Sequence, residues 1–154
     1  MALRTWRIAL VVWMALIFLV SSSLLVDSMD FEATEEVLGS LNYFARKLAH
    51  IVEYAILAYL WLRSICTAPE RFHRCLVWSV LLTVVYAATD EVHQNFVPQR
   101  LGLWSDVVFD AVGALGMGYV LRQIHREGSA ELRVRVLGPA GIYTAAGPEN
   151  AAIK

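Results

Sequence analysis

Charged residues are scarce in this chain, since only 18% of its 154 residues are Asp, Glu, Lys or Arg, against roughly 25% in soluble proteins. The net charge of −1 gives no basic field, so no nucleic-acid partner is expected. The two cysteines, Cys66 and Cys75, form neither a disulfide framework nor a zinc-finger spacing, and we interpret them as packing residues. The sequence also lacks a phosphate-binding glycine loop and a Gly-x-Ser-x-Gly elbow, which argues against nucleotide enzymes and α/β-hydrolases.

Apolar residues make up 58% of the chain, which excludes a disordered protein. A membrane helix needs roughly 20 mostly apolar residues. Four stretches come close to this length: 6–26, 47–66, 75–93 and 104–122. We therefore predict an all-α fold, a small multi-pass bundle of four transmembrane helices within one membrane domain over residues 1–126. Residues 127–154 are predicted to be a loosely ordered cytoplasmic tail, in which Glu131–Leu137 alternates like a short strand.

Arginine positions predict the orientation of these spans. With four spans, most basic residues fall on one side, which the positive-inside rule makes cytoplasmic: Arg4, Arg7, Arg63, Arg71, Arg74, Arg122 and Arg126. We expect an N-in/C-in protein of the cytoplasmic (inner) membrane, with an acidic outer loop over residues 27–46. The first span could also be a cleaved signal peptide, but its apolar run is longer than usual and shows no Ala-x-Ala site.

Polar residues gather at the predicted outer ends of the last three spans. Ionisable groups inside membrane spans are costly, so each is a functional hypothesis. Their spacing of three or four residues puts them on one helical face in each span: Lys47, His50, Glu53 and Tyr54; Tyr86, Asp90 and His93 or Gln94; Asp106, Asp110 and Gly113. If the three faces converge, they form an acid–base cluster at the outer leaflet.

The residue types of this cluster suit acid–base chemistry on a phosphate-bearing lipid. The candidate catalytic residues are His50, Glu53, Asp90, His93 and Asp110. The candidate substrate-binding residues are Lys47, Tyr54, Tyr86, Gln94, Arg100 and Asp106. In this hypothesis Lys47 and Arg100 bind phosphate, and a histidine oriented by an aspartate is acid, base or nucleophile. The five catalytic candidates also form a mixed set of histidine and carboxylate ligands that could hold a divalent metal ion as a cofactor.

Structural interpretations compete with each of these roles. Lys47 can anchor its span at the membrane interface, and His50 with Glu53 can be a hydrogen-bonded structural pair. Asp106 can cap the fourth span, where a negative charge meets the helix dipole. Glu91 is expected to face water.

Three segments resemble the VanZ-like family of small multi-span membrane proteins. They are Lys47-x-x-His50-x-x-Glu53-Tyr54, Tyr86-x-x-x-Asp90-Glu91-x-His93-Gln94-x-Phe96-x-Pro98-x-Arg100 and Asp106-x-x-x-Asp110-x-x-Gly113. Gln99 stands where the family often has Gly, which affects only the turn. The resemblance implies a protein of the cell envelope and, through the family's name member, a link to teicoplanin-type glycopeptide resistance.

The resemblance supplies no agreed activity, so two classes of function stay open. The first is an enzyme at the outer face, a hydrolase or transferase acting on an envelope lipid or lipid-linked glycan precursor. The second is a non-catalytic membrane module that binds a lipid headgroup or an envelope partner. A second copy of the chain is a further candidate partner. A transporter is less favoured, because no polar cluster lies at mid-depth.

Overall fold

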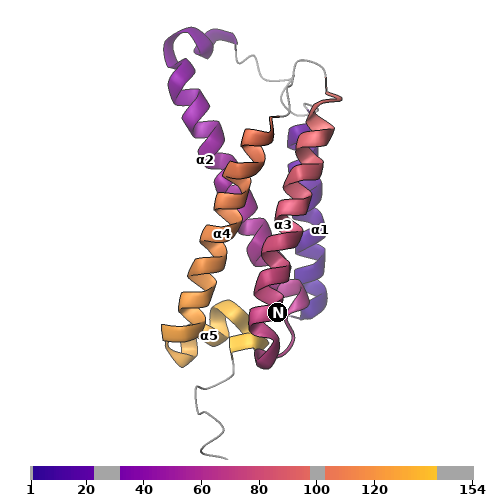
Figure 1. Ribbon diagram of the computed structural model, residues 1–154, viewed down its shortest axis with the longest axis vertical. Helices are drawn as coiled ribbons and strands as arrows, with labels where there is room; N and C mark the ends of the chain where they lie inside the picture. Colours follow the sequence, from indigo (N-terminus) through magenta and orange to yellow (C-terminus); the bar gives the residue numbers. More distant parts are fainter. Residues whose placement is uncertain (1, 23–31, 98–102, 142–154) are drawn as a thin grey trace, which may run out of the picture.

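The computed structural model describes residues 2–22, 32–97 and 103–141, with only the backbone described at 32–43, 45 and 46 (Figure 1). Its helices are α1 (Leu3–Ser21), α2 (Glu32–Ile65), η1 (Pro69–Arg71), α3 (Phe72–Gln94), α4 (Trp104–Glu127), α5 (Ala130–Leu137) and η2 (Gly138–Gly141). These described ranges contain no strand, so the predicted all-α fold is confirmed.

Four of the helical segments are long and apolar enough to cross a membrane: Leu3–Ser21, Lys47–Ile65, Pro69–Gln94 and Trp104–Glu127. Among the described residues, the prediction of four membrane-spanning helices is therefore confirmed, and residues 23–26 of the first predicted span lie outside the described residues. The predicted loop over residues 27–46 is wrong from Glu32 onward, because α2 already begins there. Glu, Ala and Leu are good helix formers, and no proline interrupts them. This extension carries α2 roughly 20 Å beyond its apolar span at 1.5 Å per residue.

The helix α2 is central to the bundle, since it packs against α1, α3 and α4, and most extensively against α4 (Figure 1). One buried apolar cluster joins α1, α2 and α3 through Leu10, Ile17, Tyr54, Leu57, Leu60 and Ala87. The outward faces carry exposed apolar side chains such as Val11, Trp78 and Val112. Lipid tails solvate such faces, so the bundle buries polar groups inside and presents apolar ones outside.

A close backbone approach holds α4 against α2. Gly113 lies so near the backbone of Ile51 that a Cβ atom at this position would overlap the Ile51 carbonyl. At Gly118 the packing is less close, since a Cβ atom there would lie 3.1 Å from Val80 Cγ2 on α3. At Gly116 a Cβ atom would have open space around it. Small residues let membrane helices approach closely. Gly113 therefore sets the spacing between α2 and α4.

The chain after α4 folds back against the far end of the bundle, where α5 lies across the helix ends (Figure 1). Leu137 and Ala140 are buried there with residues of α2, α3 and α4. The predicted strand over Glu131–Leu137 is wrong: this segment is α5, whose N-cap Ser129 accepts a hydrogen bond from the Leu132 amide at 3.2 Å. Residues 142–154 of the predicted tail lie outside the described residues.

We expect Gly113→Ala to destabilise the bundle, because the added methyl group must push α4 away from the Ile51 carbonyl. Overpacking of this kind costs about 1–3 kcal/mol. Gly116→Ala is the matched control, since it adds the same group where there is room. The midpoint of thermal unfolding in detergent should fall for Gly113→Ala alone. Equal midpoints for the two variants would contradict the close contact.

Cys66 should resist alkylation in the folded protein. It is buried at the α5 end of the bundle, where burial and the neighbouring Cys75 thiol raise the pKa of the Cys66 thiol to about 12. Only the thiolate reacts, and a free cysteine has a pKa of about 8.5. In a Cys75→Ala background at pH about 8, where an exposed thiol is partly ionised, maleimide should modify Cys66 only after unfolding in SDS. Rapid labelling of the folded protein would contradict this packing.

Candidate functional site

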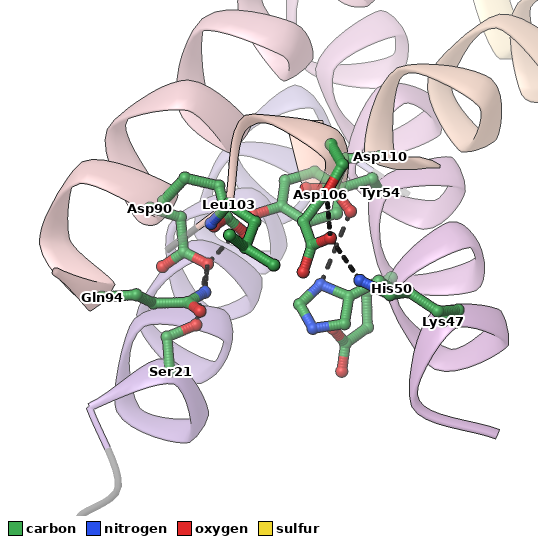
Figure 2. A network of polar contacts seen from close by, with 12 residues as sticks. Ser21, Lys47, His50, Tyr54, Asp90, Gln94, Leu103, Asp106 and Asp110 are labelled. Carbon is green, nitrogen blue, oxygen red and sulfur yellow. Dashed lines mark hydrogen bonds and ion pairs between the residues drawn. The ribbon is translucent and has the colours of Figure 1, made fainter. Parts of the chain in front are cut away.

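Most of the predicted polar residues meet at one end of the bundle, which we call the polar end (Figure 2). It is formed by the last turns of α1 and α3, the first turns of α4 and the part of α2 around His50. Two separate networks lie there, one centred on Asp90 and one between α2 and α4.

The first network is centred on the carboxylate of Asp90, which is buried. Its Oδ2 atom accepts hydrogen bonds from the Ser21 hydroxyl at 2.8 Å, the Tyr54 hydroxyl at 3.2 Å and the Gln94 amide at 3.0 Å. These donors come from α1, α2 and α3, and all of them are buried. Charge-assisted hydrogen bonds in a low-dielectric interior are strong. Asp90 therefore ties three helices together.

The second network contains the histidine–aspartate pair of α2 and α4. His50 Nδ1 lies 3.5 Å from Asp110 Oδ1, longer than a normal hydrogen bond. The Asp110 side chain is fully buried, and neither oxygen has a hydrogen-bond partner among the described residues. The His50 side chain keeps 25% of its surface exposed. Figure 2 shows Nδ1 directed toward Asp110, so Nε2 is on the opposite edge of the ring.

An ion pair between Lys47 and Asp106 lies next to this pair (Figure 2). The Lys47 ammonium also lies 5.2 Å from the centre of the Phe109 ring. Both members of the ion pair are partly exposed, with 14% and 20% of their side-chain surface accessible. The predicted phosphate ligand Lys47 is thus already engaged with a carboxylate of α4, and this contact also links α2 to α4.

Glu91 is buried, so the expectation that it faces water is wrong. Its Oε2 atom accepts a hydrogen bond from the backbone amide of Leu103 at 2.9 Å, at the N-cap of α4. The first amides of a helix have no partner within it, and a carboxylate is well suited to bind one. Glu91 therefore fixes the start of α4 against α3, a role that spacing along the sequence does not reveal.

His93 and Tyr86 face α1 and belong to neither network. His93 Nε2 lies 2.9 Å from the Ser22 hydroxyl, and its ring stacks on Phe18 with centroids 4.4 Å apart. The Tyr86 hydroxyl donates to the Met14 carbonyl at 2.6 Å. Sequence reasoning missed Ser21 and Ser22. The only signal was a run of serines at the end of the first apolar stretch, and such runs are common at span ends.

The remaining candidates are Glu53, Arg100 and the metal set. The Glu53 carbonyl accepts a hydrogen bond from the Trp13 indole at 3.1 Å, and its side chain is half-buried beside His50. Arg100, with Pro98 and Gln99, lies outside the described residues. Within the described part of the chain, no three His, Cys, Asp or Glu side chains are arranged to hold a metal ion.

Comparison with known families gives one informative result. The family described as VanZ/LLP1 matches residues 6–125, which include most or all of each of the four spans and both networks of the polar end. The predicted resemblance is therefore confirmed over most of the chain. Neither the curated proteins nor the solved structures gave a match.

Asp90→Ala should destabilise the fold more than Asp106→Ala does. The first change leaves the buried donors of Ser21, Tyr54 and Gln94 without their acceptor, at about 1–3 kcal/mol for each group that stays unpaired. The second removes a partly exposed ion pair, worth about 0–1 kcal/mol. Thermal unfolding in detergent measures both. If Asp106→Ala has the lower midpoint, Asp90 is not the structural centre of the polar end.

Proposed function

Because the chain belongs to the VanZ/LLP1 family and has four membrane-spanning helices, we propose that its polar end is an acid–base site acting on a membrane substrate. The proposed substrate is an envelope lipid or lipid-linked glycan, and the proposed reaction is a hydrolysis or group transfer at the outer face of the cytoplasmic membrane.

The pairing of His50 with Asp110 carries this proposal. A buried carboxylate beside Nδ1 favours the tautomer with the proton on that nitrogen, which leaves Nε2 free to accept a proton. The same carboxylate stabilises the imidazolium that then forms, as in other histidine–aspartate pairs. The gap of 3.5 Å suits a site that tightens when substrate binds. His50 is accordingly the proposed general base or acid, and Asp110 positions it.

Binding of a phosphate group would use the cations of the polar end. Among the described residues, Lys47 would be the phosphate ligand. On binding, its ammonium group would exchange the Asp106 carboxylate for a phosphate oxygen. Arg100, a few residues before α4 in the sequence, is the second proposed ligand. Both are on the same side of the membrane as His50 in the proposed topology, since the arginines of the other helix ends favour the cytoplasm.

A non-catalytic module that binds a lipid headgroup is the second candidate. The observation that favours it is Asp90, whose three donors make part of the polar end a structural network. The two candidates differ in what they require of His50. A binding module tolerates His50→Gln, which keeps size and polarity, whereas an acid–base site does not.

We expect His50→Gln and Asp110→Asn each to abolish complementation in a strain that lacks this protein. The measurement is sensitivity to teicoplanin and to envelope stress at matched membrane levels. Loss of a general base typically costs about 10²–10⁴-fold in rate. The double variant should be no worse than either single one, because the two residues act as a unit.

His73→Ala serves as the control, since this histidine is exposed and distant from the polar end. Full complementation by His50→Gln and Asp110→Asn would refute the acid–base proposal and favour the binding module. If even the wild-type chain changes no sensitivity, the link to glycopeptide resistance that the family resemblance implies does not hold for this protein.

A further inference from the structure

An apolar groove follows the surface of α1 where it meets α3. It is lined by Val11, Met14, Ala15, Phe18, Leu19 and Tyr86. None of these side chains is charged, and the Tyr86 hydroxyl is occupied by the Met14 carbonyl at 2.6 Å. The groove therefore presents hydrocarbon and aromatic surface along its length. It lies outside both networks of the polar end.

The length of this groove matches one leaflet of a bilayer. From Val11 to Leu19 the helix rises about 12 Å, and to Ser22 about 16 Å, at 1.5 Å per residue. One leaflet contributes roughly 15 Å of hydrocarbon, half of a core of about 30 Å. A fatty acyl chain is a leaflet long. A polyprenyl carrier chain is longer than one leaflet, so the groove cannot hold it along its whole length.

A polar pair closes the groove at the polar end. Ser22 Oγ lies 2.9 Å from His93 Nε2 and also donates to the Phe18 carbonyl at 2.6 Å. The Phe18 ring lines the groove and stacks on His93 at 4.4 Å between centroids. The apolar surface thus leads directly into a histidine that neither Asp90 nor Asp110 contacts. When an acyl chain lies along the helix, the polar headgroup of its lipid lies at the level of this histidine.

We propose that this groove binds one acyl chain of a bilayer glycerolipid, with His93 accepting a hydrogen bond from a hydroxyl or ammonium group of the lipid headgroup. Because the Ser22 hydroxyl donates to the Phe18 carbonyl, it accepts its second hydrogen bond from Nε2–H of His93. The other ring nitrogen, Nδ1, is then the acceptor that faces the lipid headgroup. This proposal rests on the proposed function and narrows its substrate class from envelope lipids and lipid-linked glycans to glycerolipids. Ser22 holds the imidazole in place as a positioning residue.

Photocrosslinking of the full chain tests this site. The protein is reconstituted in vesicles of phosphatidylethanolamine and phosphatidylglycerol that contain phosphatidylglycerol with a diazirine in one acyl chain. Illumination should label residues 11–19 of α1 several-fold more than α4 around Val112 and Leu115, which are exposed and serve as the reference for annular lipid. Mass spectrometry of the peptides measures the ratio.

Two matched variants test whether the groove causes the excess. Ala15→Trp fills the groove and should remove the excess label from α1. Gly116→Trp places the same side chain in open space on α4 and should leave it unchanged. His93→Ala should lower the excess several-fold, because the acyl chain keeps its groove but the lipid loses its polar contact.

Three results would overturn the proposal. Equal labelling of α1 and α4 that Ala15→Trp does not alter would mean annular lipid only. Stronger groove labelling by a diazirine-bearing polyprenyl phosphate would assign the site to a lipid carrier. A dimer that Ala15→Trp dissociates would assign the groove to a second copy of the chain.

The lipid site and the acid–base proposal fail separately. His50→Gln lies outside the groove and should keep the labelling excess on α1. If His50→Gln also keeps complementation, the acid–base proposal fails while the lipid site stands. If the excess is absent from the wild-type protein but His50→Gln loses complementation, the lipid site alone is refuted.

Discussion

The polar end depends on the contact between α4 and α2 at Gly113. The absence of a side chain there lets the α4 backbone meet the Ile51 carbonyl, and the two helices run in the same direction in space. One turn away along α4, Asp110 faces His50, and a further turn away Asp106 faces Lys47. A larger residue at 113 would separate both pairs at once. Helix spacing, and not the charges, is therefore what makes the polar contacts possible.

The polar residues of this end differ in how many hydrogen bonds their side chains make, although one oxygen of Asp90, Oδ1, also has no partner among the described residues. The Asp90 Oδ2 atom has three donors from three helices, which suits a group that holds the bundle together. Asp110 is equally buried, but its oxygens have only the distant His50 nitrogen beside them in the described part of the chain. An unsatisfied buried carboxylate lowers stability. Such a cost is typical of groups arranged for chemistry, with a hydrogen-bonded network such as that of Asp90 Oδ2 supporting them.

Periodicity predicted which residues share a helix face, because a step of three or four residues is a property of one helix alone. Lys47 and His50 of α2, and Asp106 and Asp110 of α4, are accordingly paired as the spacing suggested. The sequence alone could not show which faces meet, since that depends on contacts between distant segments. His93 thus faces Ser22 on α1, away from His50. Glu91 binds the α4 amide of Leu103, and α5 forms where alternation suggested a strand.

The asymmetry between α1 and the other spans links the two proposals. Only 11% of the apolar window of α1 is buried, so most of this helix faces lipid. Yet its last turn reaches inside, where Ser21 binds Asp90 and Ser22 binds His93. A lipid lying along α1 therefore ends beside Ser22. The preceding residue, Ser21, is hydrogen-bonded to Asp90, the centre of its network. Tyr54 connects that centre to the face of α2 that also carries His50, 6.3 Å away between ring centroids. Lipid binding and acid–base chemistry can thus share one structural support without sharing a side chain.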